Sequence, residues 1–179
     1  MKATGIVRRI DDLGRVVIPK EIRRTMRIRE GDPLEIYTDN DGEVIFKKYS
    51  PIGELASFAT QYAEVLGKST EMGVIICDRD HCVASAGVAK REVAERRNSV
   101  ALEDVMESRK TYLHPQGEKL RPVLEGCDYK MIVAVPIISS GDISGAVVLV
   151  SEVEAAPNES DQKLAIVAAS FLGKQMEDF

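Results

Sequence analysis

The sequence predicts two domains of unlike architecture. Residues 1–52 form a β-rich module with one short helix, and residues 71–179 form an α+β domain whose antiparallel sheet is flanked by terminal helices. Residues 53–70 link the two and supply the first helix of the second domain. The length of 179 residues suits one medium or two small domains. Early in the chain, short β-branched runs alternate with turn residues, whereas later segments show helical periodicity and longer apolar runs.

Charge is distributed unevenly along the chain, which is the third sign of two modules. Residues 2–29 hold nine Lys or Arg and three Asp or Glu, so this stretch carries about +6. The formal net charge of the whole chain is −5, which leaves the remainder near −11. Such asymmetry indicates an anion-binding module joined to a different kind of domain.

The composition is that of an ordinary globular protein, with 44% apolar and 30% charged residues. No secretory signal is visible, and the longest apolar run, residues 131–138, is too short to cross a bilayer. The chain contains three cysteines, Cys77, Cys82 and Cys127. Because three is an odd number and no export signal is visible, we expect reduced thiols rather than disulfides. We therefore expect a cytoplasmic protein with no membrane partner.

Short strands around one helix are predicted for the N-terminal module. Pro19 can begin a helix because its missing N–H group costs nothing in the first turn. The peptide Asp39–Gly42 is a strong hairpin signal. The expected order is strand 4–10, turn 11–14, strand 15–19, helix from Pro19 to about Met26, strand 33–38, turn 39–42 and strand 43–49.

A module of about 50 residues buries little apolar surface by itself. Its sequence contains no Cys and no His, so neither a disulfide nor a zinc site can stabilise it. Small folds without such links usually need a partner chain or a neighbouring domain. We therefore expect this module to dimerise by interleaving with a second copy.

The short helix carries a cluster of cations. At helical spacing they lie within an arc of roughly 100°: Lys20, Arg23, Arg24 and Arg27. Ile22 and Met26 lie on another face, suited to packing on the strands. An ordinary solvated face is the alternative, but such faces mix signs and this arc holds no carboxylate. Guanidinium groups suit phosphate oxygens and guanine edges, so the arc predicts contact with DNA.

Further arginines lie at the expected strand ends and add to the same charge: Arg8, Arg9 and Arg15. A helix-turn-helix is excluded because residues 15–19, with β-branched Val16, Val17 and Ile18, occupy the place of its first helix. Loops and short helices of an interlocked dimer remain as the means of presenting these arginines to a groove.

Helices and longer strands are predicted for the second domain. Apolar residues follow helical spacing in the first and last segments, and residues 139–142 are turn chemistry between two apolar runs. The expected order is helix 54–66, strand, turn and strand over 73–87, helix 89–98, helix 101–110, strand 131–138, strand 143–152 and helix 160–176.

The sequence "GRVVIPKEIRR" at residues 14–24, with its surroundings over residues 1–50, closely resembles the AbrB family of bacterial transition-state regulators. The resemblance implies a swapped-hairpin dimeric barrel that binds double-stranded DNA with low sequence consensus. The family's DNA-contacting arginines map onto Arg8, Arg15, Arg23 and Arg24, all of which are present. With a second domain attached, it also implies control of sporulation genes, as activator and as repressor, by a nucleoid-associated protein.

The second half resembles a GAF domain more loosely. "VPIISSGDISGAVVLVSE" over residues 135–152 has the family's Pro-Ile, turn and strand arrangement, with glycines at 141 and 145. The resemblance implies a sensing domain with a small-molecule pocket and dimer contacts through terminal helices. No cyclic-nucleotide signature or chromophore-bearing cysteine motif is present, so the ligand stays unidentified and we expect no cofactor.

The terminal helices of the second domain carry two apolar stripes. Residues Leu55, Phe58, Tyr62 and Leu66 form one, and residues Leu164, Phe171 and Leu172 form the other. Both could pack on their own sheet. We expect them to pair between chains instead, which would join two barrel dimers into a homotetramer.

Two other classes of protein are alternatives. The AbrB-type barrel also serves antitoxins, but an antitoxin predicts a disordered toxin-wrapping tail. An enzyme needs a convergent catalytic set, and none is seen: "GKST" at residues 67–70 follows a helix rather than a strand, and "GDISG" does not place Ser144 in a nucleophile elbow. The cysteines and His81 lack the spacing of a zinc site. We expect a non-enzyme without catalytic or metal-binding residues.

Overall fold

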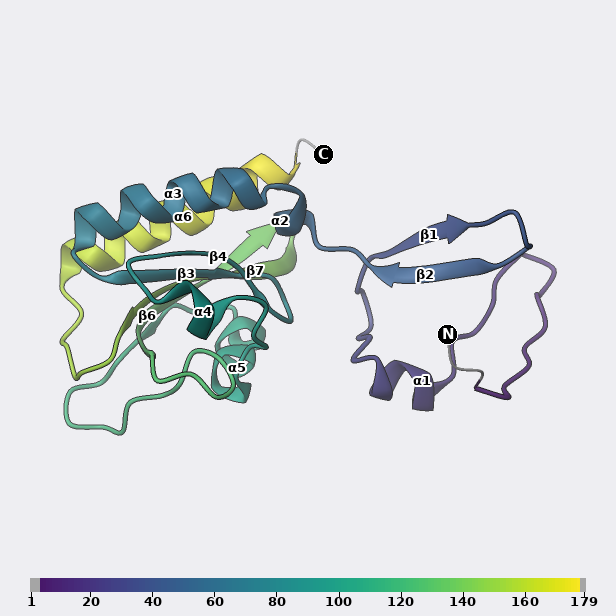
Figure 1. Cartoon of the computed structure of the whole chain (residues 1–179), viewed down its shortest axis with the longest axis horizontal. Coiled ribbons are helices and arrows are strands. Elements are labelled where there is room, and N and C mark those ends of the chain that lie inside the picture. The colour runs from purple at the N-terminus through teal and green to yellow at the C-terminus, as the bar shows by residue number, and fades with distance from the viewer. Residues whose placement is uncertain (1–3, 178–179) are drawn as a thin grey trace. The chain divides into compact units, whose positions relative to one another are not determined.

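The computed structural model describes residues 4–177 and divides the chain into two compact units, Met1–Tyr49 and Ser50–Phe179. We call them the N-terminal unit and the C-terminal unit. The N-terminal unit contains a helix and a two-stranded antiparallel sheet: α1 (Lys20–Thr25), β1 (Leu34–Thr38) and β2 (Val44–Lys48) (Figure 1).

The β1–β2 hairpin forms where the sequence predicts it. Thr38 pairs with Val44, and the turn between them is closed by Asp39. The Asp39 carboxylate accepts hydrogen bonds from the backbone N–H groups of Asp41 and Glu43, at 3.1 and 3.0 Å. Gly42 has φ of +82°, a left-handed conformation that glycine adopts without strain. The predicted turn is therefore confirmed.

The first two predicted strands differ from expectation. Residues 4–10 and 15–18 are in no strand of the described chain. A strand is stabilised by cross-strand pairs, and this part of the chain meets no second strand to pair with. The apolar side chains that a sheet would bury are solvent-exposed instead, including Val7 at 83% and Val17 at 70%.

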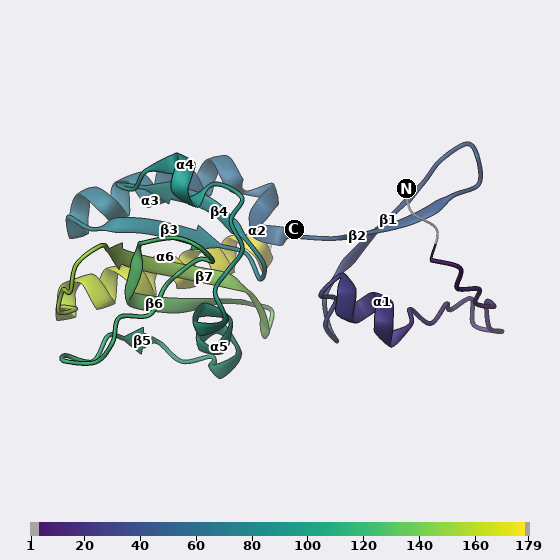
Figure 2. The same cartoon turned by 60° about the horizontal axis from the view of Figure 1, so that its bottom comes forward.

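A five-stranded antiparallel sheet in the order β4-β3-β7-β6-β5 forms the centre of the C-terminal unit. Figures 1 and 2 show α3 and α6 side by side, and Figure 1 shows α4 and α5 on the other side of the sheet from them. The elements are α2 (Pro51–Glu54), α3 (Ala56–Thr70), β3 (Gly73–Cys77), β4 (Cys82–Ala86), α4 (Lys90–Val93), α5 (Val100–Ser108), β5 (Tyr112–Leu113), β6 (Lys130–Ser139), β7 (Asp142–Ser151) and α6 (Glu159–Glu177).

Both faces of this sheet are buried, and strand periodicity divides the core in two. Val74 and Ile76 of β3 join the cluster beneath α3 and α6, whereas Ile75 and Cys77 join the cluster with α5. This alternation follows the two-residue period of a strand. Because both faces are covered, β6 and β7 read as nearly continuous apolar runs in the sequence. The prediction of an antiparallel sheet with terminal helices is confirmed.

The turn between β6 and β7 has the geometry that the sequence indicates. Ser140 and Gly141 have φ of 49° and 86°, and Ser139 pairs with Asp142. Two central residues with positive φ match the twist of an antiparallel hairpin. The hairpin predicted at residues 139–142 is confirmed.

The helix predicted over residues 89–98 is shorter than expected. It ends at Val93, and Glu95 has φ of 56°, which a continuing helix cannot accommodate. The following residues bond outside the helix: Arg97 bridges to His81, and Asn98 bridges to Leu124. Such contacts between distant residues cannot be predicted from the spacing of apolar residues in the sequence.

Gly173 allows α6 to lie directly on β6. A Cβ at this position would collide with the carbonyl oxygen of Ile138. We predict that Gly173→Ala lowers the free energy of unfolding by about 1–3 kcal/mol through overpacking. This loss outweighs the gain of up to about 1 kcal/mol from the better helix propensity of Ala.

The measurement is urea unfolding of the full chain by far-ultraviolet circular dichroism. Ser170→Ala, on the exposed side of the same helix, is the matched control and should change stability by less than about 0.5 kcal/mol. Equal effects of the two substitutions would contradict the close approach.

Candidate nucleic-acid interface

Asp11 organises the turn that carries Arg15. Its Oδ1 accepts hydrogen bonds from the backbone N–H groups of Leu13 and Arg15, at 3.0 and 2.7 Å. Its Oδ2 accepts a bond of 2.8 Å from Nε of Arg15. Gly14, with φ of +75°, lets the chain reverse between them. One carboxylate thus fixes both the backbone and the guanidinium of Arg15.

These bonds lower the pKa of Asp11, first through the Arg15 backbone N–H and next through the Arg15 side chain. A lowered pKa means that the carboxylate stabilises the fold above the ordinary range of Asp. That contribution is lost as the pH falls through the lowered value. The turn therefore keeps this support at neutral pH.

Arg23 and Arg24 are placed by α1. Pro19 precedes the helix, and its carbonyl accepts the Arg23 N–H at 2.9 Å. The Arg23 Nε donates to the Ile18 carbonyl at 3.2 Å, which fixes the root of its guanidinium. Arg24 is exposed, and its side chain makes no polar contact with any residue between 4 and 177. Both side chains can therefore reach a ligand in solvent.

The predicted four-cation arc is wrong at its last member. The helix ends at Thr25, and Arg27 has φ of 51°, so Arg27 lies outside the helix. Ile22 is half-buried, whereas Met26 is 59% exposed and covered by no strand of its own chain. The helical cations are Lys20, Arg23 and Arg24.

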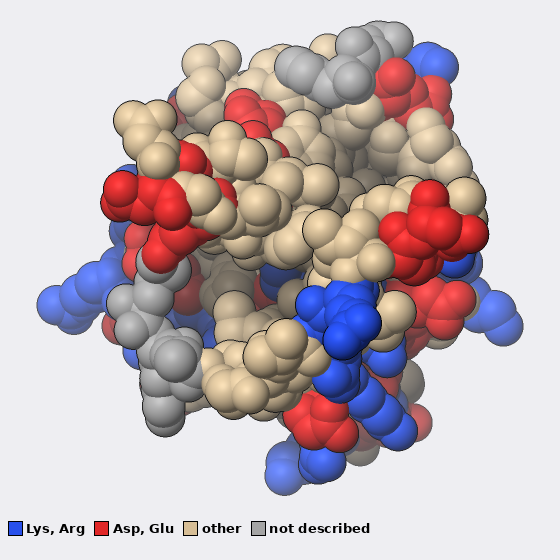
Figure 3. All heavy atoms as spheres, turned by 90° about the vertical axis from the view of Figure 1, so that its right-hand side faces the viewer, with Lys and Arg blue, Asp and Glu red and all other residues tan. Residues whose placement is uncertain are grey.

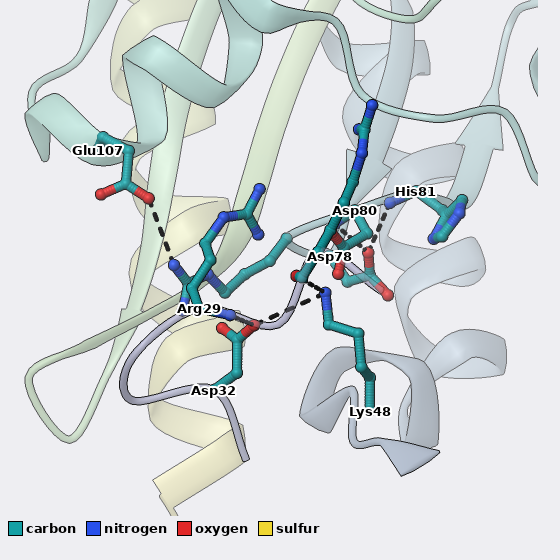
Figure 4. Close-up of polar contacts among 9 residues, drawn as sticks. Arg29, Asp32, Lys48, Asp78, Asp80, His81 and Glu107 are labelled. Atoms are coloured by element: carbon teal, nitrogen blue, oxygen red, sulfur yellow. Dashed lines mark hydrogen bonds and ion pairs between the residues drawn. The ribbon is translucent and has the colours of Figure 1, made fainter. Parts of the chain in front are cut away.

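Asp32 anchors the segment after α1 to the hairpin. Its Oδ2 accepts the Arg29 backbone N–H at 2.8 Å and lies 3.6 Å from Nζ of Lys48 on β2 (Figure 4). The same Nζ donates to the Arg27 carbonyl at 2.8 Å. The Asp32 side chain is only 2% exposed. This ion pair ties the segment after α1 to β2 and was not predicted from the sequence.

The four arginines singled out by the sequence are all exposed, and they come from three places. Arg8 lies in the segment 4–10, which belongs to no strand, and its Nη1 donates to the Val7 carbonyl at 3.1 Å. Arg15 sits in the Asp11 turn, and Arg23 and Arg24 sit on α1. No polar contact joins any two of these four within the described part of the chain. A single chain thus exposes these four arginines without bringing them together into one binding surface.

The N-terminal unit also exposes many apolar side chains. Figure 3 shows uncharged residues, in tan, lying between groups of Lys and Arg and groups of Asp and Glu. The exposed apolar residues of this unit include Ile6, Val7, Ile10, Leu13, Val16, Val17, Met26, Ile36, Val44 and Phe46. For a unit of this size, so much exposed apolar surface marks an interaction surface.

Two polar side chains of the C-terminal unit, those of Asp78 and Arg96, have structural roles. Asp78 accepts the backbone N–H groups of Asp80 and His81, both at 2.7 Å, in the turn before β4 (Figure 4). Arg96 donates to the carbonyls of Glu125 and Gly126, at 3.1 and 2.6 Å. Arg96 therefore helps to hold the loop at residues 125–126 in place.

All three cysteines are free thiols. Burial raises the pKa of Cys82 to about 11 and raises the pKa values of Cys77 and Cys127 as well. Neutral thiols at physiological pH fit a structural role. Among the residues described here, no group of three His, Cys, Asp or Glu side chains could hold a metal ion. Within residues 4–177, no helix is long and apolar enough to span a membrane.

Two family matches cover the chain. Residues 54–177 match the family "Stage V sporulation protein T C-terminal, transcription factor", and residues 7–53 match "Antidote-toxin recognition MazE, bacterial antitoxin". The N-terminal unit is also 65% identical over 51 residues to the transition state regulatory protein AbrB of Bacillus subtilis, covering 28% of this chain and 52% of that protein. These matches place the chain among two-domain transcription factors with an AbrB-type N-terminal domain.

The whole chain is 51% identical over 179 residues to stage V sporulation protein T of Bacillus subtilis, which covers 99% of each. The chain belongs to the stage V sporulation protein T family. The C-terminal unit has a GAF fold: a GAF domain of a Coxiella burnetii phosphoenolpyruvate-protein phosphotransferase matches with a TM-score of 0.52 and 21% identity, over 69% of this chain and 83% of that one. Both predicted resemblances are confirmed.

The Asp11 turn gives a direct test of the site geometry. We predict that Asp11→Ala speeds amide hydrogen exchange at Leu13 and Arg15, because both N–H groups lose their acceptor. Asp12→Ala removes the same charge from a neighbouring exposed position and should leave both exchange rates unchanged. NMR of the full chain measures both variants, and equal rates in the two would contradict the role of Asp11.

Proposed function

We propose that this protein is a homo-oligomeric DNA-binding transcription regulator of the sporulation type, acting at some genes as activator and at others as repressor. The observation that carries the proposal is an AbrB-like N-terminal unit in which Arg8, Arg15, Arg23 and Arg24 are all exposed to solvent. Arginine forks bind phosphate oxygens and guanine edges in pairs of hydrogen bonds. A cytoplasmic, nucleoid-associated location follows from this role.

Arg15 differs from the other three arginines because its guanidinium is paired with the Asp11 carboxylate. The two side chains are 69% and 35% exposed, so solvent screens their attraction and the pair contributes little net stability. A DNA phosphate can therefore replace the carboxylate at small cost. Meanwhile the backbone bonds from Asp11 keep Arg15 at the tip of its turn.

A second copy of the chain is the partner that the N-terminal unit fits. Residues 4–10 and 15–18 have no strand to pair with in the described chain, and their exposed apolar side chains are Ile6, Val7, Ile10, Val16 and Val17. Pairing with the same segments of another copy would complete a sheet, cover the apolar side chains and bring arginines of two chains to one face. The swapped-hairpin dimer is the arrangement that meets all three needs.

The antitoxin alternative rests on the family match of residues 7–53. An antitoxin of this type should carry a toxin-wrapping tail, whereas residues after Ser50 form a folded unit with a sheet buried on both faces. The match to a transcription-factor family over residues 54–177 also favours the regulator.

The outer side of α3 and α6 supports a second association. Phe58, Tyr62 and Phe171 form a ring cluster within one chain, with centroids 5.8–6.4 Å apart. Beside it, Val65 is 65% and Val167 is 57% exposed. The predicted stripes are corrected in one respect: Leu66 and Leu172 are buried in their own core and cannot pair between chains. The exposed remainder would join two dimers into a tetramer.

A tetramer would hold two DNA-binding dimers at once. Linking two weak sites raises the effective concentration of the second, so avidity exceeds the affinity of either site. The GAF-like unit would then serve assembly and regulation, with a small-molecule ligand that is not yet identified. A ligand can alter DNA binding only if it has different affinities for two arrangements of the tetramer.

The DNA-binding proposal predicts a specific salt dependence. Arg23→Ala with Arg24→Ala should weaken DNA binding and reduce the slope of log K against log salt by about 0.9 for each phosphate that the variant no longer neutralises. Fluorescence anisotropy with a labelled duplex at several salt concentrations measures both quantities. Circular dichroism should report an unchanged fold, because neither side chain is buried.

The matched control is Lys90→Ala with Arg91→Ala, which removes two exposed cations from α4. It should retain the wild-type slope. Wild-type affinity in the Arg23/Arg24 variant, or an equal loss in the Lys90/Arg91 variant, would contradict the proposed interface.

The assembly proposal predicts loss of the tetramer when charge is placed on the helices. Phe58→Glu with Phe171→Glu should leave a dimer that binds one short DNA site weakly. Because Phe58 also contacts the core, Val65→Glu with Val167→Glu provides a version confined to exposed positions. Val100→Glu with Val153→Glu, two exposed valines outside α3 and α6, is the control. Multi-angle light scattering measures the mass, and a tetramer in the helix variants would contradict the model.

A further inference from the structure

A small cavity in the C-terminal unit lies outside every feature described so far. Its volume is about 230 Å³, and its lining residues are His114, Gln116, Glu154, Ala155 and Ala156. Two stretches that are far apart in sequence meet there: the loop that follows β5 and the connection from β7 to α6. One wall therefore supplies an imidazole and an amide, and the other supplies a carboxylate.

His114 is the buried polar group of this cavity. Its side chain is 1% exposed, its backbone N–H donates to the Ile132 carbonyl at 2.9 Å, and its Nδ1 lies 3.4 Å from the Tyr112 hydroxyl. In contrast, Nε2 has no hydrogen-bond partner among the residues that the structure describes. A buried nitrogen without a partner forfeits a bond that water would have supplied. The ring is held in place but left unsatisfied at Nε2.

Glu154 faces this nitrogen across a gap. Its Oε1 lies 4.0 Å from Nε2, which is beyond hydrogen-bond length. The same oxygen accepts the Gly117 N–H at 3.3 Å, and the side chain is 58% exposed. A carboxylate can accept several hydrogen bonds, so Glu154 retains free acceptor capacity. A donor placed between Nε2 and Oε1 could bond to both.

We propose that this cavity binds a small organic molecule through a primary ammonium group. The ammonium N–H groups would donate to the Glu154 carboxylate, to Nε2 of His114 and to the amide oxygen of Gln116. The bound state uses the imidazole tautomer with a proton on Nδ1, which donates to the Tyr112 hydroxyl and leaves the lone pair on Nε2. The alanine methyl groups provide room for the ligand's carbon atoms.

The charges and hydrogen-bonding groups that line the cavity favour an ammonium ligand over an anion or a metal ion. No Lys or Arg lines the cavity and Glu154 contributes a negative charge, so an anion would be repelled. A structural metal ion needs more ligands than one imidazole and one carboxylate, and the described residues offer no third His, Cys, Asp or Glu here. An ammonium group matches several convergent acceptors with its three donors.

The test uses the full chain, ethylammonium chloride as the probe, and NMR of the imidazole rings. The chain contains only two histidines, so His81 serves as an internal reference. We expect a saturable shift of the His114 ring signals with the His81 signals unmoved. Such a small probe should bind no tighter than about the millimolar range. Tetramethylammonium, which carries the same charge but no N–H donor, should leave His114 unmoved.

Glu154→Gln keeps the shape of the side chain and removes its charge, and it should weaken ethylammonium binding by about tenfold. Glu152→Gln, an exposed carboxylate in the same connection but outside this cavity, is the matched control and should bind as the wild type does. An equal response to tetramethylammonium, equal losses in the two variants, or no saturable shift would overturn the proposal. Because the measurement contains no DNA, its failure would leave the proposed regulator function standing.

Discussion

Unsatisfied strand pairing in the N-terminal unit is the constraint on which the rest of the molecule depends. Extended backbone with β-branched side chains gains stability only when a neighbouring strand supplies cross-strand contacts. Residues 4–10 and 15–18 have no such neighbour in the described chain, and Val7 and Val17 are consequently exposed. The same deficit leaves Met26 uncovered and keeps the arginines of one chain apart. A partner copy would correct the packing and create the DNA-binding surface in one event.

The C-terminal unit buries its apolar side chains within a single chain. Its sheet is covered on both faces, and Gly145 and Gly173 permit approaches to the Cys77 and Ile138 carbonyls that any side chain would prevent. This packing leaves Val65 of α3 and Val167 of α6 exposed. The two units therefore differ in one respect: the C-terminal unit covers its own sheet, whereas the N-terminal unit leaves much of its apolar surface exposed.

Local signals predicted much of this structure because their causes are local. The turn at Asp39–Gly42 follows from its glycine and from the Asp39 carboxylate, and the turn at residues 139–142 contains Gly141 at positive φ. The terminal helices follow from apolar periodicity. Prediction was wrong where distant contacts decide, as at Glu95, whose positive φ ends α4 before residues that bridge to His81 and Leu124.

The candidate functional residues can also be divided into those with a local sequence signal and those that depend on distant contacts. The exposure of Arg8, Arg15, Arg23 and Arg24 agrees with the sequence interpretation, and their contact with DNA stays a prediction. Asp11 could have been found, since an Asp three residues before a Gly is a turn signal. Pairs such as Asp32 with Lys48, or His114 with Glu154, are invisible in sequence because folding brings together positions far apart in the chain.

The exposed apolar side chains of residues 4–10 and 15–18 also affect how activity depends on the amount of protein in the cell. During synthesis the N-terminal unit leaves the ribosome first, before its own chain is complete. If a second copy is what completes its fold, the amount of competent DNA-binding unit at low abundance rises with the square of the chain concentration rather than in proportion to it. Solitary chains would meanwhile keep unprotected segments open to proteases. A cell could therefore convert a gradual rise in expression into a sharper onset of gene control, with no ligand required.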